Sequence, residues 1–353
     1  MLQRWFAGRV GEEASPEIGD VTSPSANGMS SETLLFDANW RAAGELKSGS
    51  FVARVEPDPD DVPVFPSYDL ESQYRVLELV AANSDVPVPR VRWLEKSGDA
   101  LGSPFFVMDR VDGRVPPDLL PYTMGSWLLD ASPDERQRLQ DATVGILASL
   151  HSIALADVDA SFLEFDLPGA TPLRRHLENQ RRYFDFVKEG RSFPIIDRTF
   201  EWLEANWPED EGESVISWGD SRIGNVMYDG FEPVAVLDWE MAAIGPREID
   251  LGWLIFLHIF FQDITEKAGM AGMPDFLERE PVIAEYERRT GYRPRNMDFY
   301  EMYAAQRHAI VMSRVFARSV HFDGAVWPDE PESVIYHREV MLDMLDGKFR
   351  SRG

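Results

Sequence analysis

The sequence predicts an α+β fold of two unequal lobes, a smaller one rich in strands and a larger one built mostly of helices. Three observations lead to this class. Strand-like runs surround a single helical segment in the first third of the chain, up to about residue 112. Helical spacing of apolar residues dominates from residue 132 onward. An island of short, extended segments interrupts those helices at about 214–240.

The first lobe is predicted from residues 23–112, with a small sheet and one main helix. Residues 1–22 are rich in Gly, Glu, Ser and Pro, which predicts a loose extension with room for one short helix near Trp5. Leu70, Tyr74 and Leu77 recur at helical spacing, and Asp69 precedes them as a candidate cap. The strands of this lobe are expected at 33–36, 51–55, 87–94 and 104–111.

The second lobe is predicted from residues 113–353. A helix over 132–153 opens with Ser132 and Pro133, a cap followed by proline at the first helical position. Further helices are expected at 173–186, 195–206, 250–261, 275–290, 296–319 and 331–345, and short strands at 214–217, 225–228 and 234–237.

The composition excludes several classes of function. The chain has 61 acidic and 35 basic residues, a net charge of −26 that opposes binding to nucleic acid or anionic membranes. It has no cysteine, which rules out disulfides, thiolate metal sites and a cysteine nucleophile. No run of eighteen apolar residues occurs, and the amino-terminal segment lacks the apolar core of a signal peptide, so we expect a cytoplasmic protein.

Three polar residues of the 214–240 island carry the functional signal. Asp220 and Asp238 each follow a short apolar run, and Asn225 lies five residues after Asp220. Carboxylate and amide oxygens are hard ligands that suit Mg²⁺, and a carboxylate left off the metal can orient a hydroxyl group and accept its proton. Each residue alone is better explained as a turn former at a strand end, and only the joint pattern favours phosphoryl transfer.

The island resembles the aminoglycoside phosphotransferase and choline kinase-like family in two segments. These are Trp218-Gly-Asp-Ser-Arg-Ile-Gly-Asn225 and Leu237-Asp-Trp-Glu240. The resemblance implies a protein-kinase-like fold with an antiparallel sheet in the N-lobe, Asp220 as catalytic base, and Asn225 and Asp238 as Mg²⁺ ligands. Trp218 departs from the family's histidine. The next acidic residue along, Asp250, is interpreted as a structural cap of its helix.

The same resemblance implies nucleotide contacts in the first lobe. Ser25, Asn27 and Gly28 would form the loop over the phosphates, where small residues let backbone N–H groups approach. Arg54 would bind the phosphates and Glu71 would orient it. Read without the family, these residues are a turn, an edge-strand charge and a solvated carboxylate.

The connector between the lobes and one histidine complete the resemblance. Backbone groups near Met108, Asp109 and Arg110 are expected to hydrogen-bond the base of ATP or GTP. His151 ends the helix that precedes the island, and a packed structural role is expected for it.

The acceptor is predicted to be a small molecule bound by the helical lobe of a monomer or homodimer. Aromatic and acidic residues lie together after Asp250, among them Trp253, Asp263 and Glu266, which favours a cationic acceptor such as an aminoglycoside. The apolar content equally permits a hydroxyacyl group. Two other hypotheses stay open: a nucleotide-binding pseudokinase, suggested by Trp218, and a protein kinase, disfavoured because no activation-loop motif follows Asp238.

Overall fold

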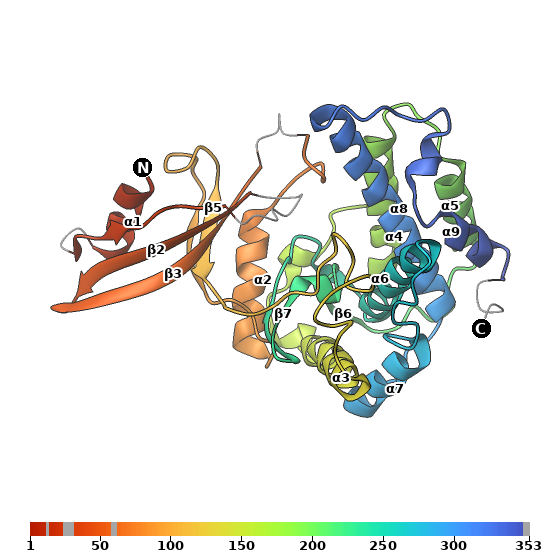
Figure 1. The fold of residues 1–353 in the computed structure, drawn as a ribbon, viewed down its shortest axis with the longest axis horizontal. Coiled ribbons are helices and arrows are strands. Elements are labelled where there is room, and N and C mark those ends of the chain that lie inside the picture. The colour runs from red at the N-terminus through yellow and green to blue at the C-terminus, as the bar shows by residue number, and fades with distance from the viewer. Residues whose placement is uncertain (12–13, 24–31, 58–61, 349–353) are drawn as a thin grey trace.

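The fold is that of a computed structural model, which describes residues 1–11, 14–23, 32–57 and 62–348. It confirms the α+β class: a five-stranded antiparallel sheet forms a small lobe, and helices form most of a larger one. The two lobes lie side by side along the longest axis of the molecule (Figure 1).

The sheet of the N-lobe has the strand order β1-β2-β3-β5-β4. Its long hairpin pairs Glu32 with Val55 and closes at Ala42 and Glu45, so that it projects away from the large lobe (Figure 1). The helix α2 begins where the sequence predicts, because the Asp69 carboxylate accepts a hydrogen bond of 2.9 Å from the Ser72 amide. The elements are β1 (Glu17–Ile18), β2 (Glu32–Ala42), β3 (Glu45–Val55), α2 (Leu70–Asn83), β4 (Val91–Glu95) and β5 (Phe105–Asp109).

The short helix expected near Trp5 is present, but the described residues around it are packed against the sheet and do not form a loose extension. Residues Leu2–Val10 form the helix α1, and β1 pairs with β2 as the outermost strand of the sheet. Phe6 is fully buried, with its ring centroid 5.7 Å from that of Trp40 and 5.6 Å from that of Phe51. These aromatic contacts hold the amino terminus against the face of the sheet that α2 leaves open.

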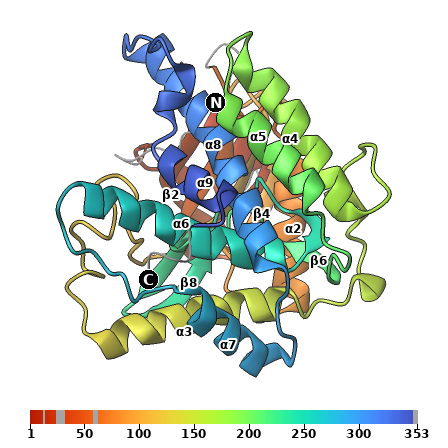
Figure 2. The same ribbon diagram turned by 90° about the vertical axis from the view of Figure 1, so that its right-hand side faces the viewer.

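The C-lobe contains the predicted helices with small shifts at their ends. The helix α3 has the complete capping box, with Ser132 and Glu135 each bonding the other's backbone amide. The last expected helix is shorter, because a 3₁₀ turn at Pro331–Val334 precedes it. The helices are α3 (Pro133–Leu150), α4 (Pro172–Lys188), α5 (Pro194–Ala205), α6 (Glu248–Lys267), α7 (Arg279–Thr290), α8 (Met297–Phe322) and α9 (Arg338–Leu345), and Figure 2 shows them in front of the sheet. None of the described helices is long and apolar enough to cross a membrane.

Two small ladders hold the polar island in place. The strand β7 (Val226–Asp229) pairs with β8 (Glu232–Val236), which forms the predicted hairpin. The strand β6 (Ser214–Ser217) pairs with β9 (Ala243–Pro246), which the sequence did not predict because a Gly-Pro pair ends it. Both ladders end at the loops that carry Asp220 and Asp238, so these loops meet on one side of the C-lobe.

Candidate active site

Asp220 lies at the centre of the site and accepts hydrogen bonds from three side chains. Trp253 Nε1 donates to its Oδ1 at 2.7 Å, and Asn225 Nδ2 donates to its Oδ2 at 2.7 Å. Arg222 Nε lies 3.2 Å from both carboxylate oxygens. The carboxylate is therefore fixed in orientation from three directions.

The residues expected to bind magnesium fit that role by their chemistry. Because Asn225 directs its amide nitrogen to Asp220, its carbonyl oxygen remains as a ligand. Burial raises the pKa of the Asp238 carboxyl, Arg54 opposes that rise, and the negative charge of Asp220 adds to it. Crowded, desolvated carboxylates of this kind are stabilised by a cation. No group of three or more His, Cys, Asp or Glu within the described residues could hold a metal, so phosphate oxygens and water would complete the shell.

Asp238 also has an unusual backbone conformation. Its φ is +61°, in the left-handed region that side chains other than glycine seldom adopt. Asp tolerates this region better than bulky residues because its short side chain can hydrogen-bond locally. Such backbone outliers gather at functional sites, where the surrounding structure holds them in place.

Arg54 reaches the site, but Glu71 does not accompany it. Arg54 Nη2 lies 3.3 Å from Asp238 Oδ1, and its Nη1 lies 3.3 Å from Thr33 Oγ1. Glu71 instead forms an ion pair with Lys96 at 2.7 Å, on a half-exposed part of α2. Among the described residues no hydrogen bond or ion pair joins Glu71 to Arg54, so the predicted orienting role of Glu71 is wrong for this arrangement. Asp238 and Thr33 orient Arg54 in its place.

Trp218 stands where the family has a histidine, and it makes hydrogen bonds that support the loop of Asp238. Its indole Nε1 donates to the Leu237 carbonyl at 2.9 Å and to the Asp238 carbonyl at 3.1 Å. The ring is fully buried and packs against Trp239 with centroids 6.0 Å apart. A donor at this position therefore ties the loop of Asp220 to the loop of Asp238, and no acceptor is needed.

Asp250 holds the loop of Asp220 through hydrogen bonds to its backbone. Its carboxylate accepts hydrogen bonds from the backbone amides of Trp218 and Gly219, both at 2.8 Å, and from Ser217 Oγ at 3.0 Å. The expected role as a cap of its own helix is therefore corrected, although the role is structural as predicted. Burial, the largest influence, would raise its pKa, but the interactions with His151 and the hydrogen bonds from the Gly219 and Trp218 amides together outweigh burial, and the net pKa is lowered. His151 is buried and packed, as expected.

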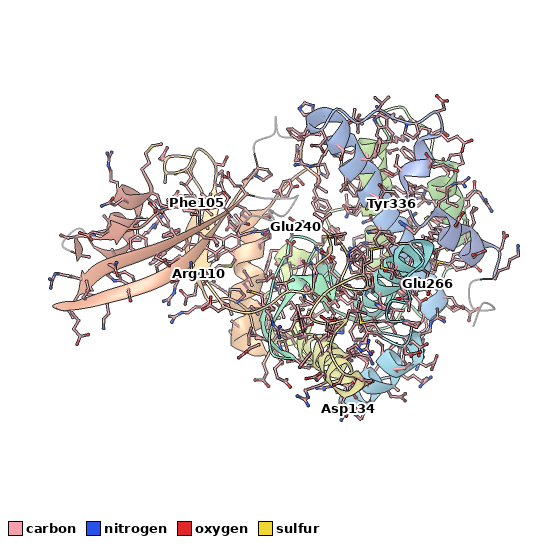
Figure 3. The ribbon with its side chains drawn as sticks, viewed as in Figure 1. Phe105, Arg110, Asp134, Glu240, Glu266 and Tyr336 are labelled. Atoms are coloured by element: carbon pink, nitrogen blue, oxygen red, sulfur yellow. The ribbon has the colours of Figure 1, made fainter. Side chains whose placement is uncertain are left out.

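Arg222 is a site residue that the sequence did not single out. Besides Asp220, it forms an ion pair with Asp118, from the segment that follows the lobe connector. Burial raises the pKa of Asp118, and the charge of Arg222 opposes that rise. The negative charge of Asp220 and Asp238 therefore faces a partly buried guanidinium. Glu240, two residues after Asp238, lies where the lobes meet (Figure 3).

The connector residues and the phosphate loop are placed differently. The amides of Asp109 and Arg110 already donate to the carbonyls of Arg90 and Ser50, both at 2.9 Å, so neither amide is free to bind a base. Met108 is buried in β5. The expected contacts of this connector with a nucleotide base stay a prediction, in which the amides of Asp109 and Arg110 take no part. The expected phosphate-loop residues Ser25, Asn27 and Gly28 lie outside the described residues.

The acidic residues expected to favour a cationic acceptor have partners within α6. Asp263 forms an ion pair with Lys267 at 2.9 Å, and Glu266 accepts a hydrogen bond from Gln262 at 2.8 Å. Glu266 lies on the helical lobe at a distance from Glu240 and the lobe junction (Figure 3). Each of these carboxylates therefore already has a partner on its own helix, and a cationic acceptor stays a prediction.

Two curated relatives are similar over most of this chain. The probable acyl-CoA dehydrogenase IBR3 of Arabidopsis thaliana is 25% identical over 325 residues, 85% of this chain and 37% of the relative. Acyl-CoA dehydrogenase family member 11 of Homo sapiens is 28% identical over 270 residues, 72% of this chain and 33% of the relative. The chain thus spans about a third of the length of these relatives, and their names describe the whole proteins.

Solved structures share the fold over nearly the whole chain. A putative aminoglycoside phosphotransferase from Ralstonia eutropha superimposes with a TM-score of 0.68 at 24% identity, covering 99% of this chain and 97% of that one. Aminoglycoside phosphotransferase APH(4)-Ia, in a ternary complex with ADP and hygromycin B, gives a TM-score of 0.58 at 15% identity, covering 99% and 98%. These likenesses confirm the protein-kinase-like fold.

The family follows from the sequence itself. The profile of the phosphotransferase enzyme family matches residues 38–299, which include β3, the connector, the island and all of α6. That span covers well over half of the 353 residues. With Asp220, Asn225 and Asp238 gathered at one site inside it, the chain belongs to the phosphotransferase enzyme family.

Proposed function

We propose that this protein transfers the γ-phosphate of ATP or GTP to a hydroxyl group of a small molecule. The observation that carries the proposal is the arrangement around Asp220, whose carboxylate is held by Asn225 and Trp253 beside the partly buried carboxylate of Asp238. Phosphoryl transfer needs little covalent chemistry from a protein, and positioning and charge stabilisation supply most of the rate. This site offers both.

In the proposed reaction Asp220 orients the acceptor hydroxyl and receives its proton. The hydroxyl oxygen bonds to the γ-phosphorus as the bond from that phosphorus to the leaving oxygen of the nucleotide breaks. The contacts of Arg222 with Asp220 are the longest that this carboxylate receives, at 3.2 Å, so an incoming hydroxyl would displace them first. The freed guanidinium would then face the transferring phosphate, which favours such cations.

Magnesium would be held by Asn225 and Asp238, the oxygen ligands that remain after Asp220 is committed to the acceptor. When bound, it supplies charge that neutralises the phosphates of the nucleotide. Arg54 lies 3.3 Å from Asp238 and would bind phosphate oxygens from the N-lobe side.

For the acceptor we propose a hydroxyacyl group rather than a cationic amine. The carboxylates Asp263 and Glu266 are already paired, which removes the support for a cation. Beyond Trp253, α6 is apolar and buried through Phe256 and Phe260. The curated relatives carry the name acyl-CoA dehydrogenase, which places a matching segment in proteins named for acyl substrates. An aminoglycoside remains the second candidate, because a structural neighbour binds hygromycin B.

The proposal is tested by a screen for phosphate transfer from γ-labelled ATP and GTP, with and without Mg²⁺. Acceptors are hydroxyacyl thioesters, aminoglycosides, amino alcohols and sugars, and Asp238→Asn is the control because it weakens the metal site without changing size. We expect labelled hydroxyacyl product only with the wild type and Mg²⁺. Labelling of aminoglycosides alone would show that the acceptor is an aminoglycoside and not a hydroxyacyl group. Nucleotide binding without transfer to any acceptor would favour a pseudokinase and contradict the proposal.

The expected cytoplasmic location and the oligomeric state, monomer or homodimer, stay predictions. Size-exclusion chromatography with light scattering distinguishes the two oligomeric states directly.

A further inference from the structure

Arg307 of α8 is a buried cation without an acidic partner. Its side chain is almost completely inaccessible, and no ion pair joins it to a carboxylate in the part of the chain that the structure describes. Only Nη2 has a hydrogen-bond acceptor, the carbonyl oxygen of Gly219 at 3.1 Å, while Nε and Nη1 have none. A buried guanidinium left this way is costly, so a role is expected to retain it.

The carbonyl that Arg307 holds belongs to the loop of the proposed catalytic base. Gly219 directly precedes Asp220, and its φ of +86° lies in the left-handed region. A side chain at this position would bring its Cβ to 2.1 Å from the Met241 carbonyl oxygen, so the loop passes close to the segment after Asp238. Arg307 therefore binds the loop at a constrained point, one residue from the reacting carboxylate.

Arg307 also stacks on the residue that donates to Asp220. Its guanidinium carbon lies 4.5 Å from the ring centroid of Trp253 and 5.4 Å from that of Tyr303. The Trp253 indole N–H donates to Asp220 Oδ1 at 2.7 Å. A cation over an indole face is attracted to the ring, and the attraction grows where water is excluded. The same cation draws electron density from the ring, which makes the indole N–H a stronger donor.

The packing of α6 on α8 makes this arrangement possible. Gly252, beside Trp253, approaches α8 so closely that a Cβ there would lie 2.8 Å from the Tyr300 backbone. Arg307 follows Tyr300 by two turns on α8, which returns its side chain to the same helix interface. The contact between the helices thus fixes the distance between the guanidinium and the indole.

We propose that Arg307 is a positioning residue that sets the orientation of Asp220 through two routes, the Gly219 carbonyl and the Trp253 indole. The inference rests on the proposed function of Asp220. Displacement of a catalytic group by about 1 Å costs up to roughly a hundredfold in rate. Loss of Arg307 therefore lowers kcat for phosphate transfer, and it leaves nucleotide affinity unchanged because the hydrogen bond and ring contacts of Arg307 are to Gly219, Trp253 and Tyr303 and not to Arg54 or Asp238.

The test compares Arg307→Met, Arg307→Lys, Trp253→Phe and the double variant Arg307→Met/Trp253→Phe. Arg174→Met is the matched control, since Arg174 also stacks on a tryptophan, Trp207, at 3.4 Å but lies outside the site. We expect kcat to fall about ten- to a hundredfold in Arg307→Met with unchanged nucleotide Kd and acceptor KM. Arg307→Lys recovers part of the rate, because lysine keeps the cation and one donor.

The double variant separates positioning from general support of the fold. If Arg307 acts through Trp253, the double variant loses less than the product of the two single losses. A purely structural role instead lowers the melting temperature of every Arg307 variant and gives independent losses. Unchanged kcat in Arg307→Met, or fully multiplicative losses, overturns the inference.

A second readout does not depend on transfer. With ¹⁵N-labelled tryptophan, the indole N–H resonance of Trp253 is identified as the one missing in Trp253→Phe. We expect it to move upfield in Arg307→Met and in Asp220→Asn, and to stay in place in Arg174→Met. An unmoved resonance in Arg307→Met overturns the indole route. If the wild type transfers no phosphate but the resonance still moves in Arg307→Met, the proposed function is wrong. The contacts from Arg307 through Trp253 to Asp220 are then still supported.

Discussion

Trp218 can replace the family's histidine because this position needs only a hydrogen-bond donor. A histidine ring can both donate and accept a hydrogen bond, whereas an indole can only donate. At this position the acceptors are two backbone carbonyls, those of Leu237 and Asp238, so a donor is all that is required. The substitution therefore does not by itself indicate an inactive pseudokinase.

The donor role predicts the behaviour of two Trp218 variants. Trp218→Phe keeps an aromatic ring but leaves the two buried carbonyls without their donor, which costs about 1–3 kcal/mol. We expect kcat to fall roughly tenfold or more, because the Asp238 loop loses its tie to the Asp220 loop. Trp218→His restores a donor and should retain more activity than Trp218→Phe, as initial rates of phosphate transfer will measure. Equal rates for the two variants would contradict this role.

At the residue level, the sequence was sufficient for the groups that share a motif and insufficient for their distant partners. Asp220, Asn225 and Asp238 lie within twenty residues and were predicted together. Trp253 and Arg307 reach the site only through the crossing of α6 and α8, which no local pattern records. Glu71 was misplaced because a helix position alone does not show which of several cations a carboxylate will meet.

Among the elements, α1 is the one whose contribution was most underestimated. Its composition resembles that of a loose segment, yet Leu2 and Phe6 are buried against the sheet. Aromatic side chains bring large buried areas, so two inward positions suffice to hold a nine-residue helix to the N-lobe. The helices of the C-lobe, by contrast, were predicted because each presents a long apolar face.

This packing predicts a large effect of Phe6→Ala. The ring is fully buried among Phe36, Trp40, Phe51 and Trp93, and its removal should cost about 3–5 kcal/mol in the free energy of unfolding. Urea unfolding monitored by tryptophan fluorescence measures this change in the N-lobe transition. Leu46→Ala on the same sheet is the control, because Leu46 is 70% exposed and should cost little. A Phe6→Ala protein as stable as the control would show that α1 does not support the sheet.

At the scale of the whole molecule, buried histidines make stability depend on pH. Burial lowers the pKa of His176 to about 3, and that of His258 and His337 to about 4. In the unfolded chain a histidine has a pKa of about 6.5, so the unfolded state binds more protons below that pH. Stability is therefore full above pH 6.5 and is lost progressively as the pH falls toward 4.

The pH effect can be isolated at one residue. Between pH 7 and 5.5 each buried histidine should cost about 1 kcal/mol of unfolding free energy. His258→Gln removes that titration, although it also weakens the bond to the Tyr122 hydroxyl. Denaturant unfolding across this range should show a lower but flatter profile for the variant than for the wild type. Parallel profiles would exclude His258 as a source of the pH dependence.

The two-lobe plan and the order of the elements were predictable because hydrophobic periodicity depends on local sequence. How the lobes share the site was not, since it depends on contacts such as that between Arg54 and Asp238, residues on β3 and after β8. The residues that line the acceptor pocket were the hardest feature to predict from the sequence. Acidic residues that suggest a cation site in the sequence turn out to be paired along their own helix.

The most direct test of the central claim is the rate of phosphate transfer by Asp220→Asn. Asparagine keeps the size of the side chain and one acceptor oxygen, so it retains one of the two hydrogen bonds from Trp253 and Asn225, but it cannot take the proton of the acceptor hydroxyl. If Asp220 is the catalytic base, kcat falls about 10²–10⁴-fold while nucleotide affinity and melting temperature stay close to the wild type. Transfer at the wild-type rate by Asp220→Asn would contradict this role.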